Sequence, residues 1–211
     1  MRNLVVRPLI LAALAGLFMA TAAQACSRAA VNGADRAVPS GKAIDAALVD
    51  RAIRSEVNYY RCKAGLQPLG EAGGLRKVAT THAKWMARAR TLTHKSSVSG
   101  QKTPKSRLKV SGVRFRAGAE NIGVVARYQF EGAQFRIKSM QSCHFTTSGG
   151  AQIPPHTYAS LARHIVQLWM ASSGHRRNIL DRKMTRLGSG AGFDKTAPNC
   201  GKLYVSQTFA G

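Results

Sequence analysis

The candidate chemical groups of this 211-residue sequence are histidines and one glutamate, and His175 has the clearest local setting. An apolar stripe with helical spacing precedes it, which predicts a helix from about Thr157 to Ser173. The stripe consists of Leu161, Ile165, Leu168 and Trp169. Gly174 suits the left-handed residue that ends such a helix, so we expect His175 to project from a fixed corner. Any working site of the chain is expected to be built around this corner.

His94, Glu120 and His82 are the other ionisable residues with informative settings. His94 follows the end of a predicted helix, where an imidazole either belongs to a site or interacts with the last helical carbonyls. Glu120 is one of only nine acidic residues and has uncharged neighbours. This context predicts a partly enclosed carboxylate with a specific partner, and the alternative is a surface ion pair. His82 falls on the apolar side of its helix, which favours a core histidine.

Two helices are expected to come before His94. The apolar positions of the first are Val49, Ile53, Val57, Tyr60 and Ala64, and Gly65 is expected to end it. One face of the second is formed by Leu75, Val78, Ala79, His82, Met86 and Ala89. Residues 96–112 are rich in Ser, Lys and Gly, which predicts an exposed loop.

The second half of the chain favours strands. Residues 203–209 form a clear β run, and residues 187–193 are glycine-rich but extended. Tyr128, Phe130, Phe135 and Ile137 hint at strand, whereas Ser148–Gly150 and Pro154–Pro155 indicate a loop. Helices early in the chain and closely linked strands late in the chain predict an α+β class with a mostly antiparallel sheet.

Residues 1–25 have the features of a secretory signal peptide. Arg2 and Arg7 precede an apolar core too short to span a bilayer, and Ala23–Ala25 fits a small-x-small cleavage site. Residues 26–43 lack a period and are expected to form an arm or linker, and residues 44–211 form one domain. No later stretch is apolar enough to cross a membrane, so we expect an exported protein, periplasmic or extracellular.

The chain is strongly basic, with a formal net charge of +23. Cleavage after Ala25 removes two arginines and no acid, which leaves +21. Such a one-sided charge favours a polyanionic or anionic-lipid surface as a partner. The charge is scattered along the chain and identifies no particular polyanion, and no basic-aromatic platform indicates sequence-specific nucleic-acid binding.

Four cysteines in an exported chain indicate two disulfides, with three pairings open. We favour Cys26–Cys62, which would tie the arm to the first helix, and Cys143–Cys200, which would tie a loop to the last strand. A lipid anchor on Cys26 is the alternative for that residue, although Ala23 and Gln24 suit a lipidation signal poorly.

Several stretches, in order over residues 44–211, resemble the CAP superfamily of cysteine-rich secretory, antigen 5 and pathogenesis-related 1 proteins, in its bacterial exported form. They are Val57–Arg61 with Gly65–Leu69, Leu75–Ala87, Leu92–His94, Glu120–Ile122, Trp169–Leu180, Leu187–Gly190 and Tyr204–Phe209. Each stretch is weak alone, but the ordered set is specific.

This resemblance implies a three-layer α-β-α sandwich with a cleft lined by His94, Glu120 and His175. Asn121 and Ser172 adjoin the same motifs, and Ser172 stands where eukaryotic members carry a second glutamate. Family members bind divalent cations in the cleft, and some bind lipids in apolar grooves. The segment at about 127–157 is longer than the family's usual connection and is treated as an inserted loop.

The favoured function is therefore a binding module in which His94, His175 and Glu120 hold a divalent cation, with zinc the metal that two imidazoles and a carboxylate suit. A zinc-dependent hydrolase using the same cleft is the alternative, but no motif supplies its general base. A serine nucleophile is disfavoured because no Gly-x-Ser-x-Gly elbow is present. A basic envelope-binding protein with a structural cleft is the third hypothesis, and a small apolar ligand or lipid is a further candidate partner.

Overall fold

The computed structural model describes residues 26–40 and 44–211, so the predicted signal peptide lies outside the described residues. Within the described part, the helices are α1 (Ala46–Lys63), α2 (Gly73–Ala89), α3 (Pro104–Val110), α4 (Tyr158–Ala171) and α5 (Ser173–Ile179). The strands are β1 (Gly70–Glu71), β2 (Gly118–Ala126), β3 (Phe135–Ser139), β4 (His144–Thr147), β5 (Arg186–Asp194) and β6 (Lys202–Ala210). None of the helices in these two ranges combines the length and apolar character that a membrane span requires.

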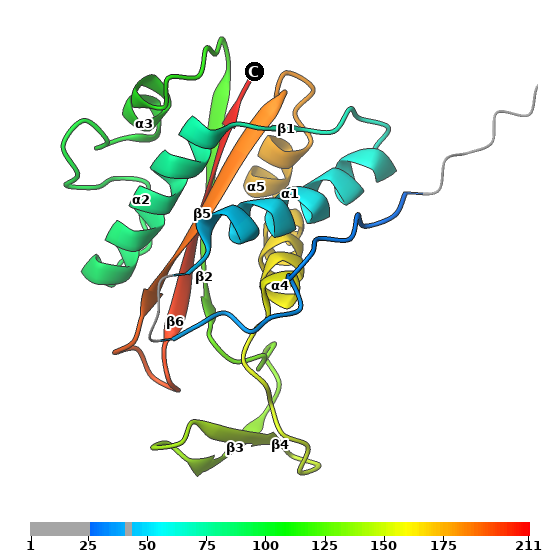
Figure 1. The fold of residues 1–211 in the computed structure, drawn as a ribbon, viewed down its shortest axis with the longest axis vertical. Coiled ribbons are helices and arrows are strands. Elements are labelled where there is room, and N and C mark those ends of the chain that lie inside the picture. The colour runs from blue at the N-terminus through cyan, green and yellow to red at the C-terminus, as the bar shows by residue number, and fades with distance from the viewer. Residues whose placement is uncertain (1–25, 41–43) are drawn as a thin grey trace, which may run out of the picture.

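A four-stranded sheet with the order β1-β5-β6-β2 forms the middle layer. Strand β6 pairs antiparallel with both β5 and β2, and only the short β1 runs parallel to its neighbour. Figure 1 shows α2 and α3 on one side of this sheet and α1, α4 and α5 on the other. The predicted α+β class, the mostly antiparallel sheet and the three layers are all confirmed.

Glycines at alternate positions of β5 explain how α2 packs so closely on the sheet. A Cβ atom at Gly188, Gly190 or Gly192 would overlap the backbone of α2. These three residues therefore face α2, while Leu187 and Ala191 point into the core on the opposite face. Because this face of β5 carries no side chains at these three positions, the backbone of α2 packs directly against the strand.

The other layer buries most of the apolar stripe predicted for α4. Leu161, Ile165 and Trp169 lie in the main core, and the Trp169 indole N–H donates a hydrogen bond to the carbonyl of Ile122 at 3.0 Å. The expectation for Leu168 was wrong, since 46% of its surface is exposed. It lies one helical step, about 100°, from Trp169 and so leaves the inner face.

The corner after α4 forms differently from the prediction. Ser172 has an extended backbone, which separates α4 from α5, and Gly174 is the second residue of α5 rather than a left-handed helix end. The expected glycine stop was wrong, although the abrupt change of direction before His175 is present. Gly65, by contrast, follows α1 with the positive φ of 65° expected of a helix-ending glycine.

Helix α3 corrects the predicted 96–112 loop. Thr103 and Ser106 cap it reciprocally, with hydrogen bonds of 3.1 and 2.8 Å between side chain and backbone, and Pro104 occupies its first turn. These are signals of a helix start, and the helix is too short to show an apolar period.

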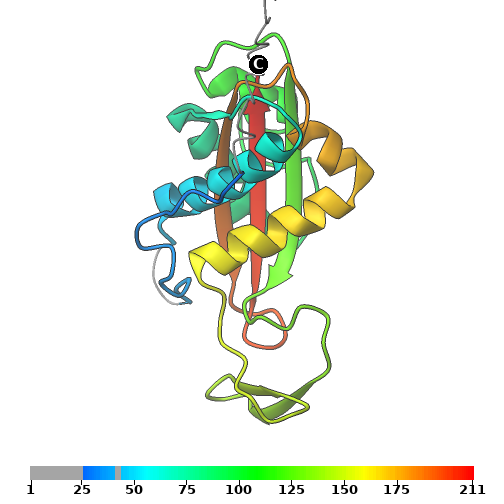
Figure 2. The same cartoon turned by 90° about the vertical axis from the view of Figure 1, so that its right-hand side faces the viewer.

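The 127–157 segment carries the β3–β4 hairpin, which projects beyond the end of the sandwich in Figures 1 and 2. The predicted strand is confirmed at β3, whereas Tyr128 makes only an isolated bridge, to Pro155. The hairpin has a small core of its own, made of Tyr128, Phe130, Phe145 and Ile153.

Both predicted disulfides are present. Cys143–Cys200 fixes the hairpin to the β5–β6 connection, and Cys26–Cys62 fixes the N-terminal arm to α1. An ion pair between Arg28 and Glu56, with Nε and Oε2 2.6 Å apart, holds the arm at a second point. The arm thereby covers part of α1 and α4.

Candidate functional site

Glu120 is the centre of the candidate site. It is the third residue of β2, and only 1% of its side chain is exposed. Its Oε1 lies 2.9 Å from Nδ1 of His94 and 2.6 Å from Nη2 of Arg107, while its Oε2 accepts from Nε of Arg107 at 2.7 Å. The carboxylate thus forms a bidentate ion pair with the Arg107 guanidinium and a hydrogen bond with the His94 imidazole. It is the enclosed carboxylate with a specific partner that the sequence predicted.

Arg107 contacts Glu120 directly but was not among the site residues predicted from the sequence. It projects from α3, is fully buried, and also donates to the carbonyls of Gln101 at 2.7 Å and His94 at 2.6 Å. The only sequence signal was the Thr103–Ser106 cap, which places a short helix at this point. Arg107 therefore ties the loop carrying His94 to the sheet.

The electrostatics of Glu120 follow from these contacts. Burial alone would raise the pKa of the Glu120 carboxyl, but hydrogen bonds from His94 and Arg107 outweigh burial and lower that pKa. An ionised carboxylate accepts hydrogen bonds, so the facing Nδ1 of His94 carries a proton. In neutral His94 the other ring nitrogen, Nε2, is then the one with a free lone pair.

His82 lies beneath this pair as a buried histidine, as predicted. Its Nε2 is 3.0 Å from the carbonyl of Thr93 and 3.9 Å from Oε1 of Glu120, and its ring stacks on Trp85. Burial, followed by the charge of Arg107, lowers the pKa of His82 to about 4. A neutral His82 therefore fills the space under the site.

His175 lies in α5 and is half-buried. Burial, followed by the charge of His94, lowers the pKa of His175, which places the two imidazoles within electrostatic reach of each other. The neutral form of the His175 ring is consequently favoured. His94 and Glu120 are in direct contact, and His175 approaches them from a separate element.

Asn121 has a supporting position rather than an open one. It is fully buried, donates to the His175 carbonyl at 3.3 Å and to Oε1 of Gln207 at 3.2 Å, and accepts from Asn178 at 2.9 Å. This chain of amides joins α5 to β2 and β6. The sequence interpretation had not included Asn178 and Gln207.

Ser172 lies at the junction of α4 and α5, half-buried, and its hydroxyl does not cap α5. Ser172 is not among the hydrogen-bond partners that the structure gives for the side chains of His94 and Glu120. Its assignment to the cleft stays a prediction.

The chemistry of the donor set decides how a metal would fit. Within residues 26–40 and 44–211, no three His, Cys, Asp or Glu side chains form a group suited to a metal ion. Glu120 is enclosed, and both its oxygens accept hydrogen bonds, so it does not fit as a direct ligand. The imidazole nitrogens of His94 and His175 are donors of the kind that zinc binds, and Glu120 orients His94 as carboxylates commonly orient metal-binding histidines. The metal site itself stays a prediction.

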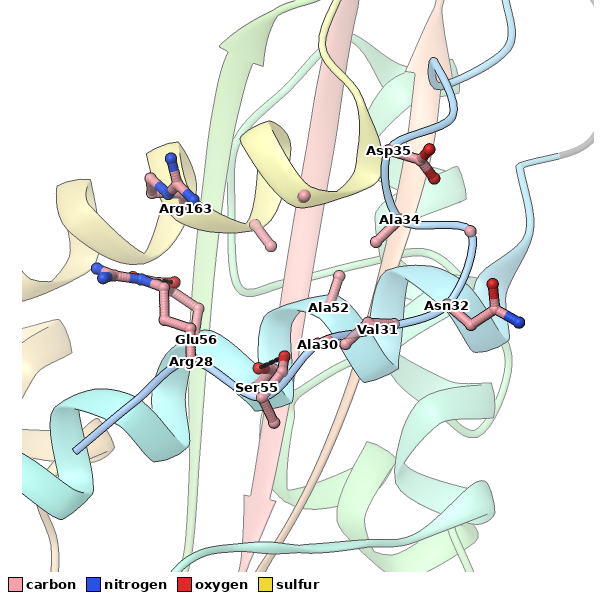
Figure 3. Close-up of a pocket in the computed structure, with 14 residues that line it drawn as sticks. Arg28, Ala30, Val31, Asn32, Ala34, Asp35, Ala52, Ser55, Glu56 and Arg163 are labelled. Atoms are coloured by element: carbon pink, nitrogen blue, oxygen red, sulfur yellow. Dashed lines mark hydrogen bonds and ion pairs between the residues drawn. The ribbon is translucent and has the colours of Figure 1, made fainter. Parts of the chain in front are cut away.

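A separate cavity of about 650 Å³ lies between the N-terminal arm, α1 and α4 (Figure 3). Small side chains such as Ala52 and Ala162 line it, together with Arg163 and the mutually paired Arg28 and Glu56. None of the histidines of the site lines this cavity. The cavity is therefore separate from the histidine site and has a different lining.

Comparison with known proteins identifies the class. The model of the Cysteine-rich secretory protein family, CAP, matches residues 54–209. This range includes His94, His175, Glu120 and the whole four-stranded sheet except Ala210, the last residue of β6. The chain therefore belongs to this family. A search of curated proteins found no match.

Two solved structures illustrate the likeness. An extracellular protein containing an SCP domain from Bacillus anthracis is 25% identical, with a TM-score of 0.51, over 77% of this chain and 40% of that one. An outer surface protein from Borrelia burgdorferi is 18% identical, with a TM-score of 0.52, over 81% of this chain and 98% of that one. The chain thus spans less than half of the Bacillus protein, and the Borrelia protein shares the fold.

Proposed function

We propose that this chain is an exported binding protein whose cleft takes a divalent cation, such as zinc, between His94 and His175. The observation that carries the proposal is the Arg107–Glu120–His94 arrangement, which fixes the His94 ring and leaves Nε2 as its free donor atom. Export is supported by the two disulfides, and the Bacillus and Borrelia proteins described as extracellular or outer-surface agree with it.

Zinc favours neutral imidazole nitrogen, and the lowered pKa of His175 keeps that ring neutral near physiological pH. With only two protein donors, water or an external ligand would complete the coordination. We therefore expect weak binding that is lost on acidification, because protons compete for both rings.

Calorimetric titration with Zn²⁺ tests the cleft. Replacing both His94 and His175 with alanine is expected to weaken binding by at least about tenfold, which corresponds to about 1.4 kcal/mol. The matched control is His144→Ala, which removes an exposed imidazole on the hairpin. Equal titrations of the wild type and the double variant would reject the cleft as a cation site.

The hydrolase alternative has less support. Hydrolysis at a bound zinc needs a base that can reach the attacking water, and the carboxylate of Glu120 is enclosed and paired with Arg107. We assign no catalytic residue.

The net charge of the chain supports a second role, attraction to a polyanionic or anionic-lipid surface. A surface partner bound through many dispersed charges is expected to dissociate as salt rises. This role is compatible with the cleft, because the basic residues are spread over the whole chain.

A small apolar ligand is proposed for the 650 Å³ cavity, on the basis of its lining by small apolar side chains and the pairing of Arg28 with Glu56. Nile red is a suitable probe because it is uncharged and has no electrostatic attraction to the basic surface. Ala159→Trp, at the cavity wall, is expected to abolish most of the probe fluorescence, whereas Ala171→Trp, exposed at the far end of α4, is expected to preserve it. Equal fluorescence in the two variants would place the probe elsewhere.

A further inference from the structure

The β3–β4 hairpin exposes two large apolar side chains next to two basic ones. Ile137 and Met140 are 52% and 47% exposed, and Arg136 and Lys138 are also exposed. Ile137 and Met140 are two of only five large hydrophobic residues exposed to this degree in the described part of the chain. Apolar side chains alternating with cations on a projecting tip suit the boundary between lipid headgroups and acyl chains.

The hairpin presents this tip on a rigid base. Phe130 stacks on Phe135 with ring centroids 4.1 Å apart, and Phe145 packs edge-on against Phe130 at 5.1 Å. The Cys143–Cys200 disulfide fastens the hairpin to the sandwich. Exposure of Ile137 and Met140 is therefore a property of an ordered element, since the aromatic residues of the hairpin are packed inside.

Charge at this end of the molecule favours an anionic partner. No acidic residue occurs between positions 132 and 157. Exposed Lys195 and Lys202 lie at the same end of the sheet, because Lys202 pairs in register with Ala126, the last residue before the inserted segment. Each basic residue near an anionic bilayer contributes about 1 kcal/mol of attraction.

The edge of β3 is poorly suited to pairing with a second copy of the chain. Lys138 falls at an irregularity in the strand register between Ile137 and Ser139, and Arg136 adds a further charge to the edge strand. Bulges and charges on an edge strand are features that prevent strand addition. A lipid surface therefore suits the tip better than another β-sheet does.

We propose that the hairpin tip is a membrane-docking element, which inserts Ile137 and Met140 at the surface of an anionic bilayer while Arg136 and Lys138 bind the headgroups. The proposal rests on the attraction to anionic surfaces proposed above and assigns it a location. Glu120 lies near the start of β2, whereas the hairpin follows its end. Docking through the hairpin would thus leave the His94–His175 cleft accessible from solution.

Binding to phosphatidylcholine vesicles with and without phosphatidylglycerol, measured by flotation, tests the proposal. Ile137→Ser with Met140→Ser is expected to weaken binding to the anionic vesicles by about tenfold or more, because the apolar contacts are lost. The matched control is Val110→Ser with Leu168→Ser, which changes side chains that are 52% and 46% exposed on α3 and α4. This control is expected to bind as the wild type does.

A soluble polyanion separates apolar docking from charge alone. The variant with Ile137→Ser and Met140→Ser is expected to retain wild-type affinity for heparin. The variant with Arg136→Gln and Lys138→Gln is expected to bind the anionic vesicles more weakly than the wild type does. The fluorescence of the tryptophan introduced by Ile137→Trp is expected to be quenched by brominated lipid. Thermal unfolding checks that each variant is folded.

The outcomes distinguish this proposal from the wider one. If the wild type binds neither vesicles nor heparin, the attraction to polyanions fails, and the docking element fails with it. If vesicle binding is strong but equal in the wild type and the Ile137/Met140 variant, only the docking element is rejected. A change from dimer to monomer in that variant, seen by light scattering without loss of vesicle binding, would assign the tip to a second copy of the chain.

Discussion

Replacing Arg107 with methionine is expected to lower the free energy of unfolding by about 3–5 kcal/mol, the cost typical of leaving one member of a buried ion pair without its partner. Glu120 would lose both guanidinium hydrogen bonds while remaining enclosed. The carbonyls of Gln101 and His94 would lose a donor as well. Urea unfolding followed by tryptophan fluorescence measures the loss.

Two further variants separate the ion pair from the helix that carries it. Lys109→Met, on the exposed side of α3, is expected to change stability by less than about 0.5 kcal/mol. Glu120→Gln combined with Arg107→Met is expected to cost less than the sum of the two single variants, because each single variant strands a buried charge. Additive losses would show that Arg107 and Glu120 do not act as a pair.

Replacing Arg61 with methionine is expected to cost about 4 kcal/mol, because four backbone carbonyls would lose a charged donor. Arg61 is 1% exposed, and burial lowers its pKa. Its guanidinium donates to the carbonyls of Gln67, Ile179, Asp181 and Met184 at 2.8, 2.8, 3.0 and 3.4 Å. One side chain thus holds the end of α1 against the chain that leaves α5.

Arg51→Met is the matched control, since it removes an exposed arginine from the same helix. Its effect on the urea midpoint is expected to be small. Arg61→Lys is expected to recover only part of the loss, because an ammonium has fewer donors than a guanidinium and lacks its planar fork. A stability loss for Arg61→Met as small as that for Arg51→Met would contradict this account.

The long elements could be predicted from sequence because their patterns repeat over several turns or alternations. Val49 to Gly65 and Leu75 to Ala89 gave two helices at nearly the correct ends, and the β run at 203–209 gave β6. The disulfide pairings followed from where each cysteine lay relative to these elements. These repeated apolar patterns were sufficient to predict the α+β class.

Short elements, and the partners that a residue acquires only in the folded chain, were harder to predict from the sequence. Helix α3 spans only two turns, so its caps are its main local signal. Glu120 could be expected to have a partner, but the chain has 32 lysines and arginines, and nothing local selects Arg107 among them. Gly174 was misassigned because its conformation depends on how α4 turns into α5, which is decided by packing.

The arm that walls the 650 Å³ cavity is joined to α1 by Cys26–Cys62, a bond of a kind that forms in oxidising compartments. In a reduced precursor, the arm would be held only by noncovalent contacts such as Arg28–Glu56, so the wall could open and the cavity would be incomplete. Oxidation would then complete the cavity wall, and capture of the apolar ligand proposed above would be a property acquired during maturation.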